Sequence, residues 1–497
     1  MRLRFLAGLL LLFPVTLTAQ ASAYVPLDDP RLPILEHLIT RGDVADPSPM
    51  IRPFRRADAE RVLAAADTAG AESREIIGEL RTAWAEDTTE AWWRAEGHVG
   101  AEAYTSARRD ALQPSGPNGV MPYVSLGLTA KFGNIIAVSR PTADPRLPND
   151  PDWPGRHDLI FSGRMTEAYL SGQWKWARLY YGQMDQNWGP QGVYGIPLSS
   201  WGYPRPEIGL ELGTDKIKLT AQAADLLDER DSTGTPVHRY WFAHRLSVRP
   251  SLRLSVALWE TYILGGPDQS FAGRVRNPLS LLILSDQYGL SANGNLMVGS
   301  DVSWRAGHRV TLQGQLAIDD ISYQSIPGGH VPNRYAFTVA AFGPLGRTLS
   351  WRALYTQAST LAFHTISPWE NFADAGVGLG REFPDNEQLS AFVTIPVGAR
   401  WLLTPEVTYL RQGAARITDS WPSDSVLATL PQVLSGTVAR TLRAAVQVSG
   451  ASGPVQLSAD LGFNHVTDAD NVAGRSHTRF EGRFLFTLGL SRGGSIQ

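Results

Sequence analysis

The sequence predicts an all-β protein: a transmembrane antiparallel β-barrel of about 18 strands, preceded by a small N-terminal α-helical domain. Three observations predict it. Apolar and polar residues alternate at the strand period of two from about Gly97 to Leu490. Short turns and long connections alternate along the same range, as in outer-membrane barrels. No segment after the N-terminal apolar run has enough consecutive apolar residues to cross a membrane as a helix, so a membrane-embedded chain must close into a barrel.

Composition excludes several classes of function. The chain has 497 residues, which is too long for one ordinary soluble domain. Its net charge of −3 provides no global field that would attract nucleic acid. It contains no cysteine, which excludes disulfide bonds, thiolate metal sites and cysteine nucleophiles. We therefore expect neither a nucleic-acid partner nor cysteine chemistry.

The N-terminus has the pattern of a signal peptide, which we assign to residues 1–23. Two arginines precede the apolar run Phe5–Leu17, and the Ala-x-Ala spacing follows at Ala19–Ala21 and again at Ala21–Ala23. We expect export, with a mature chain that starts near Tyr24. The alternative is a retained membrane anchor, but the apolar run is short for a spanning helix.

Residues 24–95 are expected to form a small helical domain. Apolar residues recur at helical spacing in Pro30–Arg41, Ala57–Asp67 and Glu72–Ala85, and Gly42 ends the first of these helices. The stripes predict the core of a helical bundle. Because the domain enters the first strand from the side of the short turns, we place it in the periplasm. It could act as a plug, as a platform for a periplasmic partner, or as a cell-wall-anchoring unit.

Residues 96–497 are expected to form the barrel. Alternation is clearest at Val310, Leu312, Leu316 and Ile318, at Trp401, Leu403, Val407 and Tyr409, and at Phe484, Phe486, Leu488 and Leu490. A soluble sandwich or propeller would not place every long loop at one end. We expect closure through pairing of Gly97–Ser106 with His477–Leu490. The predicted location is the bacterial outer membrane, and the expected partners are its lipid, its lipopolysaccharide and the barrel-assembly machinery.

The inward positions of the predicted strands are basic. They comprise Arg164, Lys216, Lys218, Arg239, Arg245, Arg253, Arg309, Arg352, Arg400, Arg479 and Arg483, offset in part by Asp319, Glu406, Asp460 and Glu481. One interpretation is a set of internal ion pairs that brace a wide barrel. The other is a lumen that favours anions. A diffusion porin for anionic solutes is the corresponding alternative function.

The candidate binding site is the loop within Gln183–Leu212. Glycine and proline are dense here and prevent regular structure. The candidate substrate-binding residues are the four aromatic side chains and two neighbouring charged ones: Trp188, Tyr194, Trp201, Tyr203, Arg205 and Asp185. Exposed rings can stack on sugar faces, and an arginine can pair with a uronate. This third external loop could fold outward as a binding rim, fold inward as a constriction, or pack on itself without a ligand.

No catalytic or cofactor motif competes with this interpretation. The sequence has no His-Glu-x-x-His, no Gly-x-Ser-x-Gly and no phosphate-binding glycine loop, and its ten histidines are scattered. The acidic turns at 149–152 and 468–471 could bind calcium, but solvated turns explain them better. We expect no metal, no cofactor and no enzymatic activity. A barrel lipase or protease stays open as an alternative, because its site could assemble from distant strands.

The same loop resembles the Wzi family of outer-membrane capsule-assembly proteins. The residues that carry the resemblance are Trp188, Gly189, Pro190, Leu198, Ser199 or Ser200, Pro204, Pro206 and Leu210. The layout of signal peptide, short helical domain and 18-strand-type barrel is also similar to the family. Trp201-Gly202 stands where the family pattern has Asn-Ala. The resemblance implies a non-enzymatic lectin that holds capsular or exopolysaccharide at the cell surface.

Overall fold

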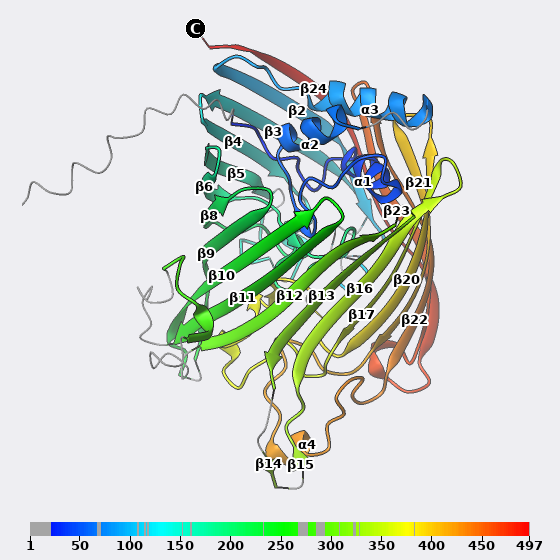
Figure 1. Ribbon diagram of the computed structural model, residues 1–497. Helices are drawn as coiled ribbons and strands as arrows, with labels where there is room; N and C mark the ends of the chain where they lie inside the picture. Colours follow the sequence, from blue (N-terminus) through cyan, green and yellow to red (C-terminus); the bar gives the residue numbers. More distant parts are fainter. Residues whose placement is uncertain are drawn as a thin grey trace, which may run out of the picture.

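The computed structural model describes residues 21–496, apart from 67–70, 107–108, 114–115, 117–118, 152, 160–161, 232, 267–276, 285–293, 308, 322–324, 328 and 382. Its main feature is a closed antiparallel barrel of 18 strands, which confirms the predicted fold class (Figure 1). The barrel strands are β2 (Ala91–Tyr104), β3 (Gly119–Phe132), β4 (Ile135–Ala143), β5 (Gly163–Gln173), β6 (Ala177–Gln183), β8 (Glu207–Gly213), β9 (Ile217–Arg230), β10 (Pro236–Ser251), β11 (Leu254–Gly266), β12 (Gly294–Ala306), β13 (Val310–Asp320), β16 (Arg334–Leu345), β17 (Leu349–Ala358), β20 (Asn386–Val397), β21 (Trp401–Gln412), β22 (Ala439–Ser452), β23 (Val455–Thr467) and β24 (Ser476–Ser495).

The barrel closes between its first and last strands. β2 pairs with β24 along its whole length, with Gly97 opposite Leu490, which confirms the predicted closure. The first strand begins at Ala91, however, so the boundary at residue 96 is corrected toward the N-terminus. Trp92 is buried on the inward face, where it packs with the N-terminal segment. Closure satisfies the backbone groups that an open edge would leave unpaired in lipid.

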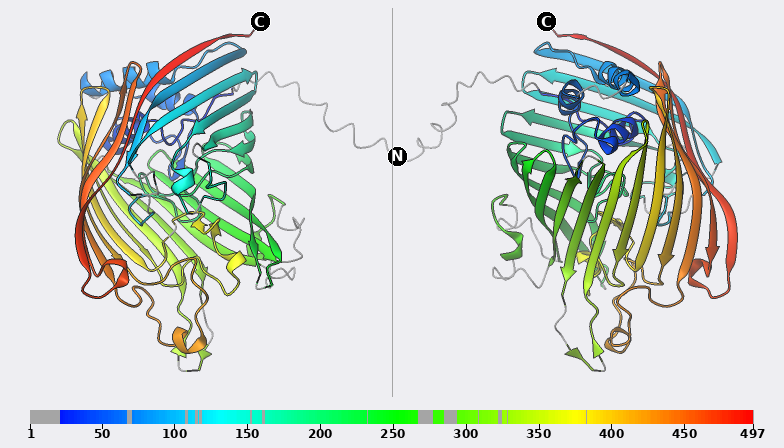
Figure 2. Two further views of the ribbon diagram at one scale, coloured as in Figure 1. Left: turned by 180° about the vertical axis from the view of Figure 1, so that it is seen from behind. Right: turned by 45° about the vertical axis from the view of Figure 1, so that its right-hand side comes forward.

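The helical domain lies at the end of the barrel where the short turns are (Figures 1 and 2). It contains α1 (Leu32–Arg41), α2 (Arg56–Ala64) and α3 (Ala71–Trp84). The apolar faces of the three helices share one core, which also includes Leu402 of β21. The domain is fixed to the wall by α1: His37 Nδ1 lies 2.8 Å from Ser350 Oγ, and Arg41 Nη1 donates to the Leu349 carbonyl over 3.0 Å. No helix in the described parts of the chain combines the length and apolar character needed to cross a membrane.

The third external loop folds inward. Its residues Asn187–Trp188 (β7) pair with Ile51–Arg52 (β1), which follow α1, so the loop and the helical domain meet inside the barrel. Three apolar loop residues, Trp188, Ile196 and Leu198, pack against inward residues of β9 to β17 and against the connection after β17. The alternative of an outward rim is thereby excluded.

Residues 21–23 are part of this fold, although the signal-peptide assignment of 1–23 includes them. The Ser22 amide donates to Gln173 Oε1 over 3.1 Å, and Gln173 Nε2 donates back to the Ser22 carbonyl over 2.9 Å. The Ala57 amide donates to Ser22 Oγ over 2.9 Å. Residues 1–20 lie outside the described residues. Cleavage after the first Ala-x-Ala spacing, Ala19–Ala21, would keep Ser22 and its hydrogen bonds, so this site fits the fold better than the second.

We expect the mature protein to begin at Ser22. Cleavage after Ala23 would remove the residue whose side chain and backbone hold the start of α2 and the end of β5. Intact-mass measurement of the protein purified from outer membranes tests this directly. A mass that corresponds to a start at Tyr24 would contradict the expectation.

Candidate functional site

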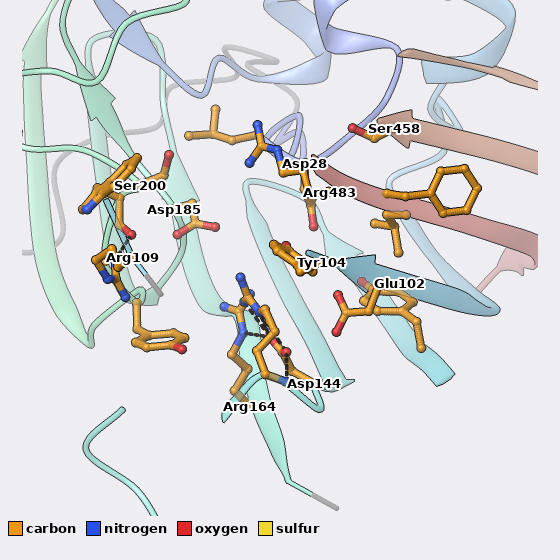
Figure 3. A pocket seen from close by; sticks show the side chains of 18 of the residues that line it. Asp28, Glu102, Tyr104, Arg109, Asp144, Arg164, Asp185, Ser200, Ser458 and Arg483 are labelled. Atoms are coloured by element: carbon orange, nitrogen blue, oxygen red, sulfur yellow. Dashed lines mark hydrogen bonds and ion pairs between the residues drawn. The ribbon is translucent and has the colours of Figure 1, made fainter. Parts of the chain in front are cut away.

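A cavity of about 300 Å³ lies inside the barrel near the extracellular ends of β2 and β4 (Figure 3). Its walls come from the segment before α1, from β2, β3 and β5, from the connections after β2 and β4, from β23 and β24, and from the inward loop. Four of the six predicted binding residues line it: Asp185, Tyr194, Trp201 and Tyr203. The sequence did not identify Glu102 and Tyr104 of β2 or Arg483 of β24 as lining residues. Alternation places these three on inward faces, but only the closed sheet shows that they share one wall.

The cavity's aromatic rings pack edge to face. Tyr194 and Trp201 have ring centroids 4.7 Å apart, as do Trp153 and Tyr203. Trp201 is only 5% exposed, so little of its ring is open. The expectation of freely exposed stacking platforms is therefore corrected: the rings are held in place by one another.

Trp188 does not belong to the cavity. It is 1% exposed and lies in the apolar core of the lumen. The Arg245 guanidinium lies 5.9 Å from the Trp188 ring centroid. The Trp188 carbonyl accepts a hydrogen bond from Gln315 Nε2 over 2.8 Å. Trp188 anchors the inward loop in the apolar core of the lumen. Its predicted role as a surface platform is wrong.

Arg205 is also used inside the protein. It is 9% exposed and its guanidinium lies 3.5 Å from Asp374, a residue of the loop after β17. Burial lowers the pKa of Arg205, and the nearby Asp374 opposes that shift. The predicted pairing of Arg205 with an acidic sugar would have to displace Asp374, so the structure does not present it as a free cation.

The arginines that line the cavity are bound to carboxylates. Asp144 lies 2.5 Å from Arg146 and 2.9 Å from Arg164. Burial opposes ionisation of Asp144, but the two guanidiniums hold its pKa well below the usual range. Elsewhere in the lumen, ion pairs join Arg245 to Asp301 and Lys218 to Glu211. These pairs favour the bracing interpretation of the basic lumen over the anion-attracting one.

Two carboxylates of the cavity, Glu102 and Asp185, differ from Asp144 because no arginine lies within ion-pair distance of them in the described part of the structure. Glu102 is 4% exposed, and its Oε1 has no hydrogen-bond partner in the described part of the structure. Asp185 lies across the cavity from it (Figure 3). Burial raises the pKa of Asp185 to about 6, with Arg164 the main opposing charge. Among the described residues, no group of three or more histidine, aspartate or glutamate side chains is arranged to hold a metal ion.

Comparison with known proteins identifies the fold. No family model and no curated protein matches the sequence. Among solved structures, the chain is similar to Wzi, an outer-membrane protein involved in group 1 capsule assembly in Escherichia coli and described as a carbohydrate-binding β-barrel. The TM-score is 0.65 at 13% identity, over 96% of this chain and 100% of that one. The fold is Wzi-like.

The Wzi-like fold confirms the architecture that the sequence resemblance implied, and the closed barrel places the protein in the bacterial outer membrane. At this level of identity the likeness concerns the fold alone. Two further solved structures are more distant. OprD of Pseudomonas aeruginosa has a TM-score of 0.45 at 10% identity over 81% of this chain and 94% of that chain. OccAB4 of Acinetobacter baumannii has a TM-score of 0.45 at 10% identity over 82% and 99%.

Proposed function

We propose that this outer-membrane barrel binds a surface polysaccharide, capsular or exopolysaccharide, without acting on it chemically. The observation that supports this most is the cavity itself. Loop residues Tyr194, Trp201 and Tyr203 surround it together with carboxylates and arginines, a combination that suits sugar C–H faces and hydroxyls. The similar fold of a carbohydrate-binding barrel involved in capsule assembly supports the same proposal.

Binding is favoured over solute diffusion because the lumen contains two obstacles. The inward loop forms an apolar core with the strands of the wall, and the helical domain packs against the periplasmic end. A diffusion porin requires a continuous aqueous path instead. We therefore propose a binding protein whose loops hold polymer at the cell surface.

A polysaccharide-retention assay tests the proposal. The variant is Trp201→Ala/Tyr203→Ala, and the matched control is Trp174→Ala/Trp176→Ala, which removes two exposed tryptophans from a periplasmic turn. Each cavity ring contributes on the order of 1 kcal/mol, so the double variant should weaken retention about tenfold or more. The control should retain polymer as wild type does. Equal retention by all three barrels, each shown to be assembled, would refute the proposal.

Binding should also depend on pH through Asp185. Its neighbours are Arg164 on β5, Arg140 on β4, Arg146 after β4 and Asp28 before α1. As pH falls through about 6, the carboxylate gains a proton and accepts hydrogen bonds less strongly, so polysaccharide affinity should fall.

Folding stability should change in the opposite direction. Because the folded state holds the Asp185 proton more tightly than the unfolded state, stability should rise slightly as pH falls from about 6 toward about 4. Affinity titrations and thermal unfolding, both between about pH 7 and about pH 5, measure the two effects separately. Asp185→Asn should reduce the pH dependence of the affinity. A wild-type affinity that is constant over this range would contradict the assignment.

A further inference from the structure

The cavity lining combines two carboxylates that lack an ion-pair partner among the described residues with four arginines that each lie near a carboxylate. Among the residues that the structure describes, neither the Glu102 nor the Asp185 carboxylate has an ion-pair or hydrogen-bond partner that would neutralise it. The arginines of the lining each lie near a carboxylate. Arg109 lies 3.1 Å from Asp150, and Arg146 and Arg164 share Asp144 at 2.5 and 2.9 Å. Arg483 reaches Asp460 at 4.0 Å, and Asp460 itself lies 2.5 Å from Arg443. Asp28, the remaining carboxylate of the lining, is bound to Arg140 at 2.9 Å.

The lack of a partner for Glu102 has an energetic consequence because Glu102 is almost fully buried. A buried acceptor without a partner is costly, and the cost is relieved when a ligand donates a hydrogen bond to it. A carboxylate oxygen accepts hydrogen bonds from a ligand, and a donor from the ligand that stabilises the ionised form makes a stronger bond than one between neutral groups. Figure 3 shows Glu102 and Asp185 on two sides of the cavity, so one ligand between them could donate to both.

We propose that the cavity selects a sugar residue that presents hydrogen-bond donors, as hydroxyls or as an amino group, and disfavours a uronate. This inference rests on the proposed function and specifies the sugar class of the same site. The carboxylate of a uronate would meet two carboxylates without a partner, while Arg109, Arg146 and Arg164 are already bound to Asp150 and Asp144. The selected residue belongs to a neutral or amino-bearing stretch of the polymer.

The same geometry corrects the sequence-based idea of an acidic sugar. That idea relied on Arg205 as a free cation and on a lumen rich in arginine. Arg205 lies 3.5 Å from Asp374, and three arginines of the lining are bound to Asp150 and Asp144. The groups that lack a partner and face a ligand are therefore the acceptors Glu102 and Asp185.

The test uses surface polysaccharide extracted from the cells that make the protein, cleaved to oligosaccharides and separated on an anion exchanger into an acidic fraction and a non-acidic fraction. Binding of each fraction to the purified full-length barrel is measured for wild type, Glu102→Gln and Asp185→Asn. Glu96→Gln is the matched control, because Glu96 lies on the same face of β2 but outside this cavity. All measurements are repeated with a chelator.

We expect wild type to bind the non-acidic fraction at least tenfold more tightly than the acidic one. Glu102→Gln and Asp185→Asn should each weaken that binding about tenfold and reduce the preference between fractions, while Glu96→Gln leaves both unchanged. Tighter binding of the acidic fraction, or binding that Glu102→Gln does not alter, would overturn the inference but leave the proposed function intact. Loss of binding in chelator would also overturn it, because a cation would then occupy the carboxylates. Failure of both fractions to bind would instead refute the proposed function.

Discussion

Trp188→Ala is expected to open the barrel. Trp188 is 1% exposed and lies where the inward loop, the β1 segment and the lumenal wall meet. Removing a buried tryptophan of this kind costs about 3–5 kcal/mol, and the cost falls on the packing of the loop rather than on the strand ladders. In planar bilayers the variant should conduct ions well above the wild-type level.

The control for this experiment is Trp176→Ala, which removes a tryptophan that is 64% exposed in a periplasmic turn. It should leave conductance unchanged. Thermal unfolding of Trp188→Ala should show earlier loss of tertiary structure with the strand content retained. If Trp188→Ala conducts no more than wild type and unfolds at the same temperature, the loop does not act as the plug.

Asp385→Ala is expected to release the extracellular loops that follow β17 and β21. The side chain is fully buried and accepts hydrogen bonds from Thr360 Oγ1 at 3.0 Å, from the amides of Ala415 and Leu434 at 3.1 and 2.6 Å, and from Ser435 Oγ at 2.6 Å. Its loss leaves several buried donors unsatisfied, at about 1–3 kcal/mol each. Hydrogen exchange across 413–436 should accelerate strongly.

Asp385→Asn serves as the graded comparison. The amide keeps one acceptor oxygen and tolerates the left-handed backbone, in which residue 385 has φ of 57°. Its exchange rates should lie between those of wild type and Asp385→Ala. Exchange in both variants that equals wild type would show that other contacts order these loops.

Sequence periodicity was sufficient for the barrel because the relevant signal is local. Alternation along each strand and the lengths of successive connections require no long-range information. The inward course of the third loop is different, since it depends on Ile51 pairing with Trp188 across the chain. Composition alone cannot distinguish an aromatic loop that binds sugar at the surface from one that is buried as a plug.

The sequence predicted the part of the candidate site that is local in the chain and missed the part that the closed sheet brings together. Tyr194, Trp201, Tyr203 and Asp185 come from one loop, and the structure brings these four to one cavity. Glu102 comes from the first strand of the barrel and is near the loop only because the sheet closes. The number of arginines was visible in the sequence, but their partners were not, so the sequence left open whether the lumen favours anions.

A structure of the barrel in complex with an oligosaccharide from the polymer of its own cells tests the central claim most directly. We expect density for a sugar residue inside the cavity, in contact with Trp201 and Tyr203 and with its hydroxyl or amino groups directed at Glu102 and Asp185. Sugar density confined to the outer surface of the loops, with the cavity filled only by water at saturating oligosaccharide, would contradict it.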